Sequence, residues 1–290
     1  FYYQMGIRAE FSKYEIDYKH LNTLQNKQYN DFFPSIYSDY TLSDKTTISL
    51  SYDRKITRPS YTHLRPFEQK ISQTITYKGN ENLDPTYVDM LNLSLLSHFR
   101  NFNVSSSLFY SSFNNWIQLI TYETGNLING VDKIITTPVN VGKLNQLGIE
   151  IATTLKANSW LDFTGNISIH NFNQHGIFHQ VRVNNTTVKK DFKDTNWEGS
   201  FRLLTKLKIP GLFNFQTGVS HYLASEAAYY KRAAYTYANA AFSKDILKTN
   251  GSLSLTVNDI FNSNKTERIR FDDNYISQAL IANKHRTILL

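Results

Sequence analysis

The chain has 290 residues, of which 41% are hydrophobic and 14% aromatic, and its lack of cysteine excludes a disulfide scaffold and a thiolate metal site. The formal charge of +7 comes from 31 basic and 24 acidic residues, but these are scattered, whereas nucleic-acid binding requires a clustered basic surface, so we expect no nucleic-acid partner. No segment approaches the roughly 18 apolar residues of a membrane-spanning helix.

The first residues, FYYQMGIRAEF, carry no charged n-region, no apolar block and no small-residue cleavage site, and we therefore expect no signal peptide there. Their composition is typical of the interior of a β-strand. From this we expect the chain to begin inside a larger protein.

Polar and apolar residues alternate along the chain, which predicts strands with one apolar and one polar face. Between residues 46 and 53, one side carries Ile48, Leu50 and Tyr52, and the other carries Thr47, Ser49, Ser51 and Asp53. The same division recurs at 88–96, 147–151, 161–170 and 252–258. The apolar face is buried either in a soluble protein or against lipid.

Twelve strands are expected, at residues 2–18, 31–43, 45–58, 84–99, 102–122, 144–157, 159–173, 193–208, 211–224, 229–245, 250–264 and 278–290. Short turns are expected near 42–45, 99–102, 157–160, 210–211 and 248–251, and long loops at 19–30, 59–83, 123–143, 173–194, 224–230 and 265–277. Because short and long connections alternate, successive strands must run antiparallel with all tight turns at one end, as in an outer-membrane barrel. A change of parity near Ser12 and Lys13 predicts a bulge or an extra hairpin in the first strand.

Most of these strands exceed the roughly 9–11 residues that a tilted strand needs to cross the hydrocarbon layer. Aromatic residues fall into two groups, which predicts two belts at the two bilayer interfaces. The group near the tight turns is Tyr40, Phe99, Phe102, Trp160, Phe213 and Phe242, and the group near the long loops is Tyr18, Phe32, Tyr110, Trp116, Phe172, Tyr222 and Tyr230. The alternative is that aromatic residues simply favour strands.

A sheet in lipid cannot keep open edges, because each unpaired amide group there costs several kcal/mol. The strands must therefore close into a barrel. The twelve strands either close alone or belong to a larger ring. A soluble β-sandwich or propeller is the remaining alternative, and it predicts strands of about six residues.

Seven motifs occur in the order and spacing of the C-terminal barrel region of TonB-dependent outer-membrane receptors. They are GIRAEF (6–11), FFPS (32–35), SYDRKITRPSYTHLRPF (51–67), GNENLDPTY (79–87), LFYSSFNNWI (108–117), NVGKLNQLGIEI (140–151) and TVNDIFN (256–262). The chain most resembles the Bacteroidota branch of this family, and the resemblance covers nearly all 290 residues.

This resemblance implies an all-β fold, namely a transmembrane antiparallel β-barrel. The strands of this chain, about 12, would belong to a barrel of about 22 strands. Residues 1–290 would be the C-terminal part of that barrel, with the plug and the N-terminal strands absent from this chain. The implied location is the outer membrane of a Gram-negative bacterium. The implied function is TonB-coupled uptake of a scarce ligand such as a siderophore, a glycan or a peptide. The C-terminal KHRTILL departs from the family, because it lacks a terminal aromatic residue.

Two sets of candidate site residues follow from this arrangement. If the apolar face meets lipid, the polar face lines the lumen. The expected lumen-facing residues are Ser49, Ser51, Asp53, Asn92, Glu150 and Asn166. Arg58 and Pro59 end a strand, because proline has no N–H to donate, and the loop beyond them opens outside the cell, where a receptor holds its ligand. The extracellular ligand-binding candidates are Tyr61, His63, Arg65, Phe67, His175 and His179. The alternative for the loop residues at 61–67 is that they pack the loop onto its neighbours.

No motif indicates catalysis or a cofactor. His170, His175 and His179 have no carboxylate or thiol at ligand spacing, so we expect a polar surface loop there and no metal. Nucleophile elbows, P-loops, dinucleotide fingerprints and paired carboxylates do not occur, so we expect no enzymatic activity. Asn80 and Asn82 are expected to form turns, because Asn tolerates a left-handed backbone.

The expected partners are outer-membrane lipid and lipopolysaccharide, the TonB system through the plug, and a surface lipoprotein that caps the loops. The alternative function is a barrel without active transport that acts as a binding or scaffold component of a surface complex. A plug with a TonB box elsewhere in the full protein favours transport, whereas a chain complete as given favours the alternative.

Overall fold

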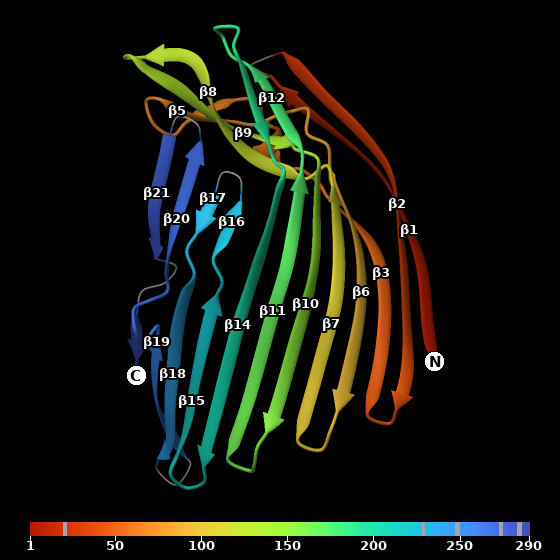
Figure 1. Ribbon diagram of the computed structural model, residues 1–290, viewed down its shortest axis with the longest axis vertical. Coiled ribbons are helices and arrows are strands. Elements are labelled where there is room, and N and C mark those ends of the chain that lie inside the picture. Colours follow the sequence, from red (N-terminus) through yellow and green to blue (C-terminus); the bar gives the residue numbers. More distant parts are fainter. Residues whose placement is uncertain (20–21, 228–229, 247–249, 273–274, 283–285) are drawn as a thin grey trace.

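The computed structural model describes residues 1–19, 22–227, 230–246, 250–272, 275–282 and 286–290. Its main feature is one antiparallel sheet of twelve strands that follow one another in chain order (Figure 1). These strands are β1 (Tyr2–Tyr18), β2 (Thr23–Ser43), β3 (Thr46–Thr57), β6 (Thr86–His98), β7 (Phe102–Asn114), β10 (Lys143–Lys156), β11 (Leu161–His175), β14 (Asp194–Ile209), β15 (Phe213–Tyr222), β18 (Tyr235–Ile246), β19 (Gly251–Asn258) and β22 (Thr287–Leu289). The predicted twelve antiparallel strands are confirmed.

The tight turns lie at one end of the sheet and the longer connections at the other, as predicted (Figure 1). Short turns join β2 to β3, β6 to β7, β10 to β11, and β14 to β15. Of the turn predicted at 248–251, residues 248 and 249 lie outside the described residues. We call the end with the short connections the turn end and the other the loop end.

Several predicted boundaries are wrong. β2 begins at Thr23, so most of the loop predicted at 19–30 is strand. β7 ends at Asn114 rather than at residue 122, because Asn115 has a left-handed backbone (φ 57°) that breaks the ladder. β19 ends at Asn258 rather than at residue 264 for the same reason, since Asp259 has φ 52°. β22 covers only Thr287–Leu289 of the strand predicted at 278–290.

The bulge or extra hairpin predicted near Ser12 and Lys13 does not occur, because β1 pairs with β2 without a register shift from Tyr2 to Tyr18. What changes along β1 is which face carries apolar residues. Toward the loop end, Tyr18 is buried beneath the segment that follows β3, while Lys13 on the other face stays exposed. The sequence pattern therefore switches parity while the backbone continues regularly.

The segments predicted as long loops contain regular structure, so that part of the prediction is wrong. A one-turn helix, α1 (Tyr61–Leu64), precedes β4 (Glu68–Lys70) and β5 (Ile75–Lys78). β5 runs parallel to β9 (Val131–Asn140), which pairs with β8 (Ile117–Ile128). A hairpin forms from β12 (Ile177–Val181) and β13 (Thr187–Asp191). A third small sheet contains β16 (Ser225–Ala227), β17 (Tyr230–Arg232), β20 (Lys265–Asp272) and β21 (Tyr275–Ala282).

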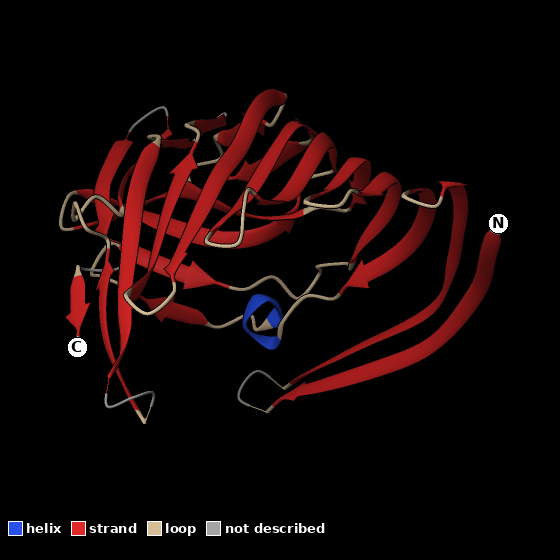
Figure 2. Ribbon diagram, turned by 90° about the horizontal axis from the view of Figure 1, so that it is seen from below, coloured by secondary structure: helices blue, strands red, loops and turns tan. Residues whose placement is uncertain are grey.

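Seen from below, the large sheet is an open arc with α1 on its inner side (Figure 2). In the described part of the chain, no ladder joins β1 at one edge to β19 or β22 at the other. None of the helical structure in the described ranges is long and apolar enough to serve as a membrane span.

The register assigns each strand residue to one face, because residues directly opposite each other in antiparallel strands share a face. One row across five strands is wholly apolar and consists of Leu50, Leu93, Leu108, Ile149 and Ile169. Each of these side chains is exposed, Leu93 by 46%, and no second layer of described protein covers them. A continuous apolar band of this size on the outer, convex face fits contact with lipid rather than with water.

Aromatic side chains form a belt at the turn end only. Tyr40, Phe102, Phe213 and Phe242 lie on the convex face, and Phe99 and Trp160 lie exposed in turns. The second belt predicted at the loop end is mostly wrong. Of its members, Phe32 and Tyr110 are exposed on the convex face, whereas Tyr18, Phe172, Tyr222, Trp116 and Tyr230 point into the inner side or the loop-end sheets.

Candidate functional site

The loop residues predicted at 61–67 are divided between packing and exposure. Ser60 caps α1 by accepting a hydrogen bond from the His63 backbone N–H (3.3 Å). The Tyr18 hydroxyl donates to the Leu64 carbonyl (3.3 Å), and the Tyr18 ring meets the Phe67 ring edge-on at 5.4 Å. Phe67 therefore anchors the loop to β1, whereas Tyr61 is 58% exposed. Arg65 donates to the Gln69 side chain.

The turn GNENLDP (79–85) packs against this loop. Gly79 is required because a Cβ atom there would overlap the Arg65 carbonyl oxygen. Asn80 forms the predicted turn by accepting from the Asn82 N–H (3.0 Å), and its amide donates to the Pro138 carbonyl (3.1 Å). The predicted reason is wrong, because neither Asn80 nor Asn82 has a positive φ. The side chain makes the turn instead.

Arg58 joins the two halves of the N-terminal wall where the β2–β3 ladder ends. The last paired residues of that ladder are Ser35 and Asp53, so the loop-end part of β2 leaves β3. Beyond this point Arg58 bridges Glu10 (2.9 Å) and Asp31 (3.7 Å). Asp31 also accepts from the Tyr87 hydroxyl (2.7 Å). This network replaces backbone pairing with charge-assisted contacts.

The predicted histidine candidates lie on strands, so the expected surface loop is wrong. His175 ends β11 and His179 lies in β12, and both are exposed. His170 lies on the inner face, with its Nε2 3.8 Å from the Glu198 carboxylate. Within the described ranges, no three His, Cys, Asp or Glu side chains are placed to hold a metal ion.

The register places all six predicted lumen-facing residues on the inner, concave face. They are Ser49, Ser51, Asp53, Asn92, Glu150 and Asn166. Glu150 and Asn166 line a hollow of about 370 Å³ on that face, together with Arg202 and Tyr222. The Arg202 guanidinium donates to the Tyr222 hydroxyl (3.5 Å). The polar row is thus one surface shared by several strands.

A larger cavity, of about 510 Å³, lies between the loop end of this inner face and the small sheets, and we call it the vestibule. β10, β11 and β14 form its floor, and residues of β8, β9, β13, β16, β17 and β20 form its walls. It is lined by Trp116, Ile117, Gln118, Leu119, Ile120, Thr121, Thr136, Leu144, Gln146, Phe172, Gln174, Lys190, Phe192, Asp194, Glu198, Ala227, Tyr230 and Arg270. None of the twelve predicted site residues lines it.

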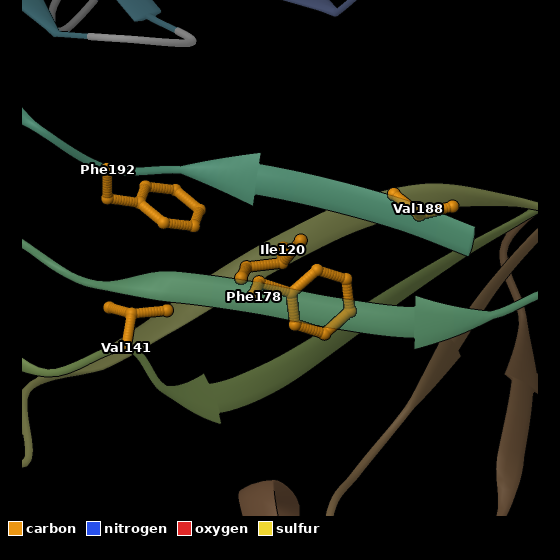
Figure 3. Close-up of a cluster of buried hydrophobic side chains, with 5 residues drawn as sticks. All are labelled: Ile120, Val141, Phe178, Val188 and Phe192. Carbon is orange, nitrogen blue, oxygen red and sulfur yellow. The ribbon is translucent and has the colours of Figure 1, made fainter.

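A buried apolar cluster holds one side of the vestibule in place. Ile120, Val141, Phe178, Val188 and Phe192 pack together between the β8–β9 and β12–β13 hairpins (Figure 3). Strand alternation explains the choice, because Phe178 faces inward while its neighbour Ile177 is 54% exposed. The cluster thereby joins the β8–β9 and β12–β13 hairpins into a single wall, although these hairpins are not consecutive in the sequence and share no backbone ladder.

Several polar side chains of the vestibule form hydrogen bonds with other residues of the chain. Lys190 is only 6% exposed and donates to the Thr121 carbonyl (2.7 Å). The Gln174 amide donates to the Gln118 side chain. Glu198 accepts from the Ser225 hydroxyl, in addition to its contact with His170. The Asp194 Oδ2 atom is buried without a hydrogen-bond partner among the described residues.

Two signals in the sequence point toward these residues. In 187–191, TVKKD, residues Val188 and Lys190 share one face of a short strand. In 268–270, RIR, the two arginines share a face in the same way. Neither signal reveals which other segment lies opposite.

Comparison with known proteins identifies the fold. A family model described as "Outer membrane protein beta-barrel family" matches residues 1–290. A comparison with curated protein sequences finds no match.

Solved structures with the same fold include the siderophore receptor PirA from Pseudomonas aeruginosa, with a TM-score of 0.60, 15% identity, and coverage of 99% of this chain and 49% of that one. The copper transporter OprC gives 0.61 and 13%, with 99% and 44% coverage. A mutant (G324V) of the ferric enterobactin receptor PfeA from Pseudomonas aeruginosa gives 0.57 and 15%, with 82% and 36% coverage. The chain thus spans less than half the length of each of these proteins.

Proposed function

Since this chain belongs to the outer membrane protein β-barrel family and lies in the outer membrane of a Gram-negative bacterium, we propose that it forms part of a receptor that imports a scarce ligand by TonB-coupled transport. The chain supplies a section of the barrel wall and the vestibule in which the ligand first binds. The polar inner face, with Glu150 and Asn166, faces the plug and the transport path.

The observation that carries this proposal is the position of the vestibule. It lies at the loop end of the inner face, opposite the end with the tight turns, which in outer-membrane barrels is the periplasmic end. A cavity of about 510 Å³ falls within the size range of small-ligand sites. The vestibule combines aromatic faces, such as those of Trp116 and Phe172, with convergent amides and charges, as ligand sites do.

The open edges of the sheet support the proposal of a larger receptor. Within the described ranges, one edge of the 17-residue β1 pairs with no other strand, and unpaired amides are strongly unfavourable in lipid. About ten further strands would complete the ring of about 22 strands, and a plug with a TonB box would fill it, as the sequence resemblance implies. The solved receptors and transporter are each more than twice as long as the part of them that this chain matches, which supports this arrangement.

A strain comparison tests the proposal. Cells with the full receptor gene, without it, and with the gene but without the TonB system are grown in the same complex medium, and the medium is followed by mass spectrometry. We expect at least one component to be depleted only when both receptor and TonB are present. Equal depletion in all three strains would contradict transport.

The alternative is a non-transporting scaffold that binds a surface partner, for example a lipoprotein. It is favoured by exposed apolar side chains on the hairpins of the loop end, at Leu127, Val131, Val181 and Val183. In the strain comparison this alternative predicts no TonB-dependent depletion. It also predicts that a membrane-anchored partner co-purifies with the barrel in detergent.

A further inference from the structure

Three arginines and one tyrosine lie on one face of the small sheet formed by β16, β17, β20 and β21, which stands at the loop end of β15, β18 and β19 (Figure 1). Tyr230 pairs directly with Arg270, and Arg232 pairs directly with Arg268. Because alternate residues of a strand share a face, all four side chains project to the same side. We call Arg232, Arg268 and Arg270 the arginine face.

The arginine face lacks compensation within the described part of the chain. Like charges directly opposite each other in a sheet are destabilising, yet Arg232 and Arg268 occupy such a pair. The Nε atoms of both are buried and have no hydrogen-bond partner among the described residues. Among the described residues, the Arg232 guanidinium donates to the Leu223 carbonyl (3.3 Å). Neither these two nor Arg270 forms an ion pair with a described carboxylate.

Two acidic residues of the same sheet, Glu226 and Glu267, lie on its other face. Glu226 is paired with Lys231, and Glu267 accepts from Gln278. Both lie one residue out of phase with the arginines, so strand alternation turns them away. Among the side chains that the structure describes, the sheet therefore has one balanced face and one face with an excess of positive charge.

The positive face adjoins the vestibule, because Tyr230 and Arg270 are part of its lining. Lys190 adds a fourth cation to this region, against two carboxylates, Asp194 and Glu198. Glu198 is already engaged by Ser225 and lies 3.8 Å from His170. Among the described side chains, the net charge on the side of β17 and β20 is positive.

We propose that the arginine face binds an oxyanion group of the transported ligand, a carboxylate, phosphate or sulfate, while the Tyr230 ring packs against the adjoining part of the ligand. This inference rests on the proposed function, since it names the chemistry of the ligand that the vestibule receives. Guanidinium groups hold oxyanions through two parallel N–H donors, which lysine cannot do. An anion between Arg232 and Arg268 also removes their mutual repulsion.

The vestibule contains a natural reporter. The chain has three tryptophans, of which Trp116 lines the vestibule, whereas Trp160 lies in a turn and Trp197 is exposed on the convex face. In the full receptor, with Trp160 and Trp197 and any tryptophans outside this chain replaced by Phe, Trp116 emission reports on the vestibule alone. The detergent-solubilised protein is titrated with citrate, inorganic pyrophosphate and inorganic sulfate, and with the neutral trisaccharide raffinose.

We expect a saturable change in Trp116 emission with at least one of the three anions, weakened by salt and absent with raffinose. Arg268→Gln and Arg270→Gln should each weaken the binding by about tenfold or more. Lys231→Gln is the matched control, because it removes the same charge from the same sheet on the opposite face. It should change the affinity by less than about twofold. The anion that binds most tightly identifies the oxyanion class.

The proposal is overturned if none of the three anions gives a saturable change, if raffinose gives the same change, or if Lys231→Gln weakens binding as much as the arginine variants. Unliganded Trp116 emission and heat-modifiable migration on gels show that each variant is folded. A TonB-dependent uptake of an uncharged compound, with no anion binding, would overturn this inference and leave the proposed function intact. Anion binding without TonB-dependent depletion would do the reverse.

Discussion

Gly148 lies directly opposite His170 in the β10–β11 ladder, and a Cβ atom on Gly148 would come within 2.5 Å of both the His170 Cβ and the Phe109 ring. The absent side chain allows the Phe109 and His170 rings to approach to 6.2 Å across it. This close packing holds the His170 ring with its Nε2 atom 3.8 Å from the carboxylate of Glu198, a residue of the vestibule lining. The inner wall is therefore shaped at one point by the lack of a side chain.

Gly148→Ala should destabilise the barrel by about 1–3 kcal/mol, because the new methyl group must displace the Phe109 ring and the His170 side chain. The measurement is the thermal midpoint of heat-modifiable gel migration. Gly218→Ala is the matched control, since it also lies within a strand and its Cβ would meet nothing closer than 3.6 Å. That variant should be neutral or slightly stabilising. Equal effects at both positions would refute the packing argument.

Leu93→Arg should destabilise the folded barrel in bilayers by about 2–4 kcal/mol, because Leu93 lies in the middle of the apolar convex row. Ser94→Arg places the same side chain at the next residue of β6, on the concave face, where water is accessible. Urea titration of the protein in lipid vesicles compares the two. A Ser94→Arg effect as large as that of Leu93→Arg would show that the faces are assigned wrongly.

Phe178→Ala should loosen the contact between the two hairpins, because Phe178 lies within the apolar cluster beside the vestibule. A buried Phe→Ala change costs about 3–5 kcal/mol. Here that cost should lower the free energy with which the β12–β13 hairpin packs on the β8–β9 hairpin. Limited proteolysis of the hairpin should become faster, while the thermal midpoint of the wall stays the same. Ile177→Ala, at the exposed neighbour, should leave the proteolysis rate unchanged. A fall in the wall's midpoint would contradict a local role.

The phenol of Tyr122 should titrate above its ordinary value, because burial, and then the nearby Glu68 carboxylate, raise the pKa of Tyr122. A raised pKa means that the folded state favours the neutral phenol. Docking of the β8–β9 hairpin should therefore be independent of this group below a pH of about 10 and weaken as the pH rises through the folded-state pKa. Phenolate absorbance, compared between the native protein and Tyr122→Phe, measures the shift. A difference titration centred at or below pH 10 would contradict it.

Local pattern was sufficient for the wall. Leu50 faces outward and Ser51 faces inward because successive residues of a strand point to opposite faces of the sheet. This alternation has a period of two residues and is visible in the sequence. The six predicted inner-face residues therefore lie on one surface in the structure. The turn-end aromatics, such as Tyr40 and Phe242, followed from the same alternation. The loop-end aromatics did not, because the inner side there is lined by protein and attracts rings such as that of Phe172.

The sequence by itself determined the antiparallel sheet, its two faces and the end at which the tight turns lie, because each depends only on neighbouring residues and on the order of connections. Only the tertiary structure decided the vestibule. Its walls bring Trp116, Lys190 and Arg270 together from segments far apart in the chain. That meeting depends on the left-handed turn at Asn115, on the apolar cluster around Phe178 and on the pairing of β17 with β20. Such long-range contacts leave no period in the sequence, since each is set by which surfaces pack together after the strands have formed.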